Sequence, residues 1–134
     1  MKAPKPVRMQ VKISETLLII VDMQYDFCNP KGPYYIPMTK RVIPNIKSIL
    51  EKARTFDMLV IHTNSHAYPT PRERRWKKLR GSFDGWHGPE VDALKPVSRP
   101  KEYIIPKTTH DIFFQTTMDD LLNLFPLVNT VIVT

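Results

Sequence analysis

The sequence of 134 residues contains a single cysteine, Cys28, and no long apolar run. One thiol cannot form an internal disulfide, so we expect a reducing, cytoplasmic setting. No hydrophobic stretch approaches the roughly 18 residues that a transmembrane helix needs. The N-terminus is basic, is broken by Pro4 and Pro6, and has no apolar segment like that of a signal peptide, so we interpret residues 1–14 as a tail. These features predict a protein that does not associate with membranes.

Internal repeats and low-complexity segments are also missing. The length is that of one domain, and the hydrophobic fraction of 42% is enough to bury a core. We therefore expect a single domain over residues 1–134.

The charge is unbalanced, with a formal net charge of +7. Six of the nine residues in Arg72–Arg80 are basic, which is compatible with nucleic acid, a membrane surface or acidic small molecules. Trp76 is the only aromatic residue in that segment, whereas proteins that bind single strands usually offer several stacking platforms. We expect this segment to be a solvated face, or a lid that packs over a cleft or at a subunit contact. A surface that recruits anions is the second interpretation, and binding of nucleic acid is the least favoured one.

Apolar runs and helical periodicity alternate along the chain. A helix is expected over residues 41–56 with Pro44 in its first turn, and another over residues 116–125 with Thr116 or Thr117 as N-cap. A short helical piece is expected over residues 89–94. Strands are expected at residues 17–21, 58–64, 102–107 and 129–134. This order is typical of an α/β fold with a parallel sheet.

Polar residues stand at the end of each expected strand. In parallel α/β sheets, ligands bind beyond the carboxyl ends of the strands, near the point where the strand order reverses. Asp22 at the end of a strand buried on both faces is therefore a candidate functional group, and we expect it to lie within ion-pair or one-water distance of Lys107. The remaining strand-end residues are Asn64, Ser65, His66 and Thr134.

Several stretches resemble the successive signatures of the isochorismatase-like cysteine hydrolases, a family that includes isochorismatase, nicotinamidase and carbamoylsarcosine amidase. The most specific are the strand followed by D-M-Q-x-D-F and the pattern formed by Lys107, Phe113 and Thr116. The resemblance covers residues 16–134 and implies a three-layer α/β/α fold with a Rossmann-like, doubly wound sheet. The stretches are "LLIIVDMQYDFC", "VIHTNSH", "GPEVDAL", "IIPKTTHDIFFQTTMDDLL" and "NTVIVT".

The resemblance implies a catalytic triad of Asp, Lys and Cys, with Asp22 as the base and Lys107 as the lysine. A thiol is mostly neutral near pH 7, so it needs an adjacent base, and a nearby ammonium favours the thiolate. In the family the cysteine follows the fourth strand, so we expect the nucleophile beyond residue 134 and a domain that is incomplete at its C-terminus. Cys28 is interpreted as a half-buried thiol in a loop.

Four residues are candidates for substrate binding: Phe27, Asn64, His66 and Trp86. Nicotinamidase-like members bind a metal with an Asp-x-His motif after the second strand and a later histidine. Here the corresponding residues are Asn64, Ser65 and His66, which lack the acid, so we expect no metal and no other cofactor. A metal bound by His66, His87 and Asp84 is the alternative. His62, inside the second strand, is interpreted as a core histidine.

The sequence is compatible with three functions. The first is cysteine-dependent hydrolysis of a small amide, ureido or carbamoyl compound by a homo-oligomer. The second is hydrolysis of the vinyl ether of isochorismate, for which the family member does not need the cysteine. The third is a non-catalytic protein that binds anions or RNA through the basic segment.

Overall fold

The structure is a computed structural model that describes residues 9–66 and 88–134. The basic segment Arg72–Arg80 and Trp86 lie outside these residues. The elements, in chain order, are η1 (Ile13–Glu15), β1 (Thr16–Val21), α1 (Tyr25–Cys28), α2 (Thr39–Thr55), β2 (Leu59–Ser65), η2 (Asp92–Leu94), β3 (Glu102–Lys107), α4 (Met118–Leu124) and β4 (Thr130–Val133).

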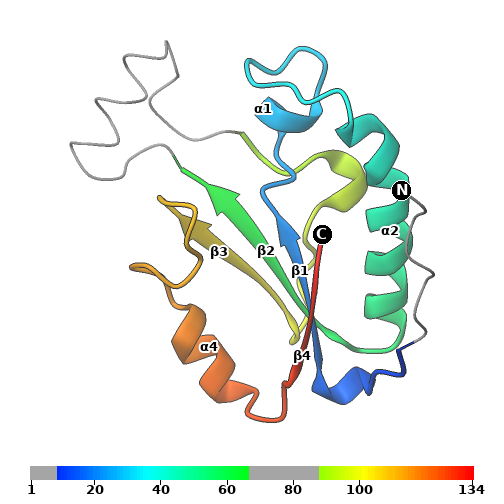
Figure 1. Cartoon of the computed structure of the whole chain (residues 1–134), viewed down its shortest axis with the longest axis vertical. Helices are drawn as coiled ribbons and strands as arrows, with labels where there is room; N and C mark the ends of the chain where they lie inside the picture. The colour runs from blue at the N-terminus through cyan, green and yellow to red at the C-terminus, as the bar shows by residue number, and fades with distance from the viewer. Residues whose placement is uncertain (1–8, 67–87) are drawn as a thin grey trace, which may run out of the picture.

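The four strands form one parallel sheet in the order β3-β2-β1-β4 (Figure 1). Val21 of β1 pairs with Thr63 of β2, and Thr63 in turn pairs with Ile105 of β3. On the other side of β1, Leu17 pairs with Val131. The strand order reverses between β1 and β4, because the chain builds outward to β3 on one side and then returns. The end of β1, where Asp22 follows, therefore lies at the point where such folds bind ligands.

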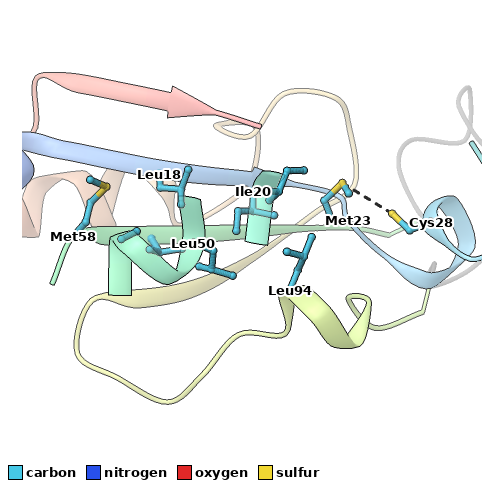
Figure 2. Close-up of a cluster of buried hydrophobic side chains, with 10 residues drawn as sticks. Leu18, Ile20, Met23, Cys28, Leu50, Met58 and Leu94 are labelled. Carbon is cyan, nitrogen blue, oxygen red and sulfur yellow. Dashed lines mark hydrogen bonds between the residues drawn. The ribbon is translucent and has the colours of Figure 1, made fainter. Parts of the chain in front are cut away.

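Alternate residues of the strands pack into two separate cores. Leu18 and Ile20 of β1 lie against α2 and η2, together with Leu50 of α2 and Leu94 of η2 (Figure 2). Leu17 and its neighbours on the same face lie against α4, and the buried members of that core are Leu17, Ile19, Leu59, Ile61, Ile105, Met118 and Leu121. Because side chains alternate between the faces of a strand, β1 is buried on both sides. The fold is a three-layer α/β/α sandwich, as expected.

Two helical predictions need correction. Helix α2 begins at Thr39, so Pro44 is its sixth residue and lies beyond the first turn. Proline has no N–H to donate there, but the buried stripe of Ile46, Leu50 and Ala53 continues the helix past it. The piece expected over residues 89–94 is helical only at Asp92–Leu94, because Glu90 forms an isolated β-bridge with Gln24.

The expected N-cap of α4 is shared between two threonines. Thr117 occupies the N-cap position, but its side chain makes no capping hydrogen bond. The Thr116 hydroxyl accepts a hydrogen bond from the Met118 N–H at 3.2 Å instead. One of the free N–H groups at the helix start is satisfied in this way.

A buried carboxylate, Glu102, lies at the start of β3, and its side chain is fully shielded from solvent. Arg54 donates to it at 2.6 and 3.1 Å, Arg99 at 2.8 Å and the Val97 N–H at 3.1 Å. Burial alone would raise the pKa of Glu102, but these donors and His62 outweigh it and lower the pKa to about 2. Glu102 is therefore held as an anion in the interior.

His62 is the core histidine that we expected. Its Nε2 lies 3.0 Å from Oε1 of Glu102, and burial lowers the pKa of the imidazole although this contact opposes the shift. Neutral His62 can then donate from Nε2. Its Nδ1 has no partner among the residues that the structure describes.

The Glu102 cluster predicts a specific pH dependence of stability. The folded-state pKa lies below the usual value of 4.5, so the stabilising contribution is complete above about pH 4.5 and is lost as the pH falls toward 2. We expect Glu102→Gln to lower the free energy of unfolding at pH 7 by about 3 kcal/mol, because it breaks a buried charge network. Urea titrations at pH 7, 5 and 3 measure this effect.

The matched control is Glu51→Gln. Within residues 9–66 and 88–134, the Glu51 carboxylate pairs only with Lys47, at 3.8 Å and exposed to solvent, which predicts a change below about 1 kcal/mol. Equal losses in the two variants, or an unchanged acid dependence in Glu102→Gln, would contradict the prediction.

Candidate active site

Asp22 and Lys107 meet at the carboxyl edge of the sheet, as the strand-end argument expected. The Lys107 Nζ donates to Oδ2 of Asp22 at 2.6 Å. The lysine side chain is 6% exposed, whereas that of Asp22 is 23% exposed. The cation is thus enclosed, and the carboxylate keeps access to solvent and to a small molecule.

Asp22 has an unusual backbone conformation, with φ of 50°. Aspartate and asparagine tolerate this left-handed region better than most residues. The Asp22 N–H is shared between the carbonyl oxygen and the hydroxyl of Thr63, both at 3.1 Å. The chain therefore turns sharply at the end of β1 and presents the carboxylate at the strand tip.

Thr63 is a site residue that the sequence analysis missed. It is 1% exposed, and its hydroxyl donates to Oδ1 of Asp22 at 2.6 Å. Because β2 lies between β1 and β3, Thr63 separates the strands that carry Asp22 and Lys107. The sequence feature that could have identified it is a hydroxyl residue just before the end of a buried apolar strand.

Gln24 joins three segments of the chain below the site. Its side chain is completely buried, accepts from the Ser65 N–H at 2.6 Å, and donates to the carbonyls of Gly88 at 2.8 Å and Ser65 at 3.3 Å. The Val91 N–H also donates to the Met23 carbonyl at 3.0 Å. The end of β1, the end of β2 and the segment that begins at Gly88 are thereby held together.

Asn64 points to the opposite face of the sheet from Thr63, since the two are neighbours on β2. Its amide nitrogen donates to Oε1 of Glu90 at 2.6 Å. Burial raises the pKa of Glu90, while hydrogen bonds from its own backbone and from Asn64 oppose that shift. In the described residues, the Asn64 side chain therefore binds Glu90. A role of Asn64 in binding substrate stays a prediction.

The other candidates for substrate binding have different positions. His66 follows β2, and its N–H donates to the Lys107 carbonyl at 2.8 Å, which places it next to the ion pair along the sheet edge. Phe27 packs partly buried against the α2-side core, with its ring 6.1 Å from that of Tyr34. Trp86 lies outside the described residues. Their roles toward a substrate stay predictions.

The loop after β3 is tied to the lysine. The Lys107 Nζ lies 3.4 Å from the Thr109 carbonyl oxygen. Asp111 accepts from the Phe113 N–H at 2.8 Å through its carboxylate, a local turn contact of the kind that aspartate often makes. Asp111 therefore shapes the loop beside the site.

Cys28 lies in the core on the α2 side. It is 6% exposed, and its Sγ is 4.0 Å from the Met23 Sδ (Figure 2). Burial raises the pKa of the Cys28 thiol, although a hydrogen bond involving Thr39 opposes the shift. A catalytic thiol needs the reverse, a lowered pKa and access to substrate. This environment disfavours Cys28 as a nucleophile.

Within residues 9–66 and 88–134, no three His, Cys, Asp or Glu side chains come together as a metal site would require. The alternative metal ligands Asp84 and His87 fall in the part that is not described, so the expectation of no metal is not tested. No helix in the described part combines the length and the apolar character needed to cross a bilayer.

An open carboxylate paired with an enclosed lysine, at the point where the strand order of an α/β/α sandwich reverses, is an arrangement suited to hydrolytic chemistry. The sequence of residues 16–134 matches the family model described as the isochorismatase domain. The chain therefore belongs to the isochorismatase family.

Relatives of this chain include proteins named as an amidohydrolase and as a hydrolase. The ureidoacrylate amidohydrolase RutB of Rhizobium rhizogenes is 30% identical over 158 aligned residues, which cover 97% of this chain and 62% of that protein. The streptothricin hydrolase of Streptomyces noursei is 30% identical over 107 residues, which cover 79% of this chain and 34% of that protein. The chain thus spans about three fifths of the first relative and one third of the second.

Solved structures share the fold. A cysteine hydrolase from Pseudomonas syringae pv. phaseolicola superposes with a TM-score of 0.74 and 26% identity, covering 98% of this chain and 64% of that one. The N-carbamoylsarcosine amidase of Thermoplasma acidophilum superposes with a TM-score of 0.70 and 22% identity, covering 89% and 66%. The similarity to the second protein concerns the fold alone.

The surroundings of Cys28 predict low reactivity. We expect iodoacetamide at pH 7 to modify Cys28 in the folded protein at least about 100-fold more slowly than in urea, because the thiol is buried and its pKa is raised. Mass spectrometry of timed samples measures the two rates. Equal rates in the folded and unfolded protein would contradict this environment.

Proposed function

We propose that the protein hydrolyses a small amide, ureido or carbamoyl compound through a covalent thioester intermediate. The observation that carries the proposal is the pair formed by Asp22 and Lys107, with 2.6 Å between Oδ2 and Nζ, at the strand-reversal point. Relatives named as ureidoacrylate amidohydrolases support the reaction class. An amide and a carbamoyl group share the electrophilic carbonyl carbon that this reaction requires.

In the proposed mechanism, Asp22 accepts the proton of a cysteine thiol while the sulfur attacks the substrate carbonyl carbon. The proton passes to the leaving nitrogen as the C–N bond breaks, which gives a thioester and a free amine. Water then cleaves the thioester, with Asp22 again accepting and returning a proton. The Lys107 ammonium positions the carboxylate and favours the thiolate by its charge.

We further propose that the nucleophile comes from outside residues 1–134, in the segment that follows β4 in longer relatives. The Thr134 carbonyl accepts from the Val21 N–H at 3.2 Å, and the Thr134 N–H donates to Ile19 at 3.0 Å. A residue that follows Thr134 would therefore emerge beside Asp22. The burial and raised pKa of Cys28, the one cysteine in the sequence, support the same placement.

The base is tested by Asp22→Asn. Asparagine keeps the volume and tolerates a positive φ, but it cannot accept the thiol proton, so we expect kcat/KM for a small ureido substrate to fall by about 10²–10⁴-fold or more. The matched control is Asp92→Asn, since the Asp92 side chain is 92% exposed and, among the residues that the structure describes, pairs only with Lys95. Steady-state kinetics on the protein that contains the segment after β4 measures both. Equal activity of wild type and Asp22→Asn would overturn the assignment.

The placement of the nucleophile predicts that a chain of residues 1–134 alone does not turn over an amide substrate. The longer protein should be active and should lose activity on treatment with a thiol alkylator, because removal of the nucleophile leaves the base with nothing to activate. Amide turnover that survives alkylation would contradict the thioester mechanism, whereas hydrolysis of isochorismate but of no amide by the alkylated protein would favour the vinyl-ether alternative. Turnover by residues 1–134 that is lost in Cys28→Ser would move the nucleophile to Cys28.

A further inference from the structure

Thr63 occupies the position between the two charged residues of the site. It lies on β2, is 1% exposed, and pairs with Val21 of β1 on one side and Ile105 of β3 on the other. Asp22 follows β1, and Lys107 ends β3. The ion pair between them is therefore formed across the strand that carries Thr63.

The Thr63 hydroxyl makes two contacts with the same residue. It donates to Oδ1 of Asp22 at 2.6 Å and accepts from the Asp22 N–H at 3.1 Å. Lys107 donates to the other carboxylate oxygen, Oδ2, at 2.6 Å. Each carboxylate oxygen thus has its own donor, and the plane of the carboxylate is fixed by two groups on different strands.

We propose that Thr63 is a positioning residue for the reaction, whose hydroxyl sets the orientation of the Asp22 carboxylate in which it accepts the proton of the nucleophile. This inference rests on the proposed function. Threonine suits the task because its β-branched side chain has few rotamers on a buried strand, so the hydroxyl direction is set before substrate binds.

Without the hydroxyl, Oδ1 would lose its donor and the carboxylate would be free to rotate toward Lys107. A lysine ammonium has three donors and could then donate to both oxygens of Asp22. The carboxylate would rotate, and the oxygen that accepts the proton would turn away from the nucleophile. Misplacement of a reacting group by about 1 Å can reduce a rate by about 10²-fold. The effect falls on the chemical step, because Thr63 is buried behind Asp22 and is not placed to bind substrate.

A purely structural role makes a different prediction. If Thr63 only packs within the sheet, the loss of its methyl group should matter as much as the loss of its hydroxyl. Thr63→Val keeps the shape and removes the hydroxyl, whereas Thr63→Ser keeps the hydroxyl and removes the methyl group. Thr63→Ala removes both, so comparison of the serine and alanine variants isolates the hydroxyl if the valine variant does not fold.

The kinetic experiment uses the protein that includes the segment after β4, with a small ureido or carbamoyl substrate. We expect Thr63→Val, and Thr63→Ala in its place if needed, to lower kcat by about 10- to 100-fold with KM within about twofold, and Thr63→Ser to retain kcat within about threefold. A hydroxyl-free variant with kcat within about threefold of wild type would overturn the inference. So would a serine variant as impaired as the valine variant.

Crystal structures of the same variants test the positioning without any need for activity. We expect the carboxylate of Asp22 to rotate toward Lys107 in Thr63→Val and to keep its orientation in Thr63→Ser. An unchanged carboxylate in the valine variant would overturn the inference. If the wild-type protein hydrolyses no amide, the proposed function fails, and the structures still decide whether Thr63 orients Asp22.

Discussion

The burial of β1 on both faces is the constraint on which the rest of the structure depends. Leu17 and Leu18 are both fully buried, although they point to opposite sides of the sheet. A parallel strand can be covered on both sides only when helices lie on each face, so α2 and α4 must pack on opposite faces. Because β1 lies between β2 and β4, its carboxyl end is flanked by neighbouring strands. Asp22 follows directly at that end.

Two carboxylates of this domain, Glu102 and Asp22, both form ion pairs but differ in their exposure to solvent. Glu102 lies at the start of β3, where its side chain is fully shielded and is surrounded by two arginines, a histidine and a backbone N–H. All of its acceptor capacity is used inside the protein, so it can only stabilise. Asp22 lies at the opposite edge of the sheet and receives one hydroxyl and one ammonium, with 23% of its side chain exposed. The open carboxylate is the one with capacity left for a reacting proton.

Chemical type alone would have pointed to Cys28, the single thiol of the sequence, which stands close to the motif that contains Asp22. The fold separates the two. Cys28 ends α1 and packs into the α2-side core near Met23, whereas Asp22 is directed toward Thr63 and Lys107. A few residues of chain are enough for this separation, because α1 turns its cysteine inward.

The sequence by itself determined the order of the elements, the parallel sheet and the strand ends. The reason is that fully buried strands produce continuous apolar runs and helices produce a periodic apolar pattern, and both patterns are local. It also predicted that Asp22 and Lys107 would meet, since both stand at the ends of expected strands. Only the tertiary structure decided the hydrogen bonds between Thr63 and Asp22, the joining of three segments by Gln24 and the pairing of Asn64 with Glu90. These depend on which strand lies between which others and on which face each residue takes. Such contacts join positions about 25 to 65 residues apart, and no local pattern in the chain encodes them.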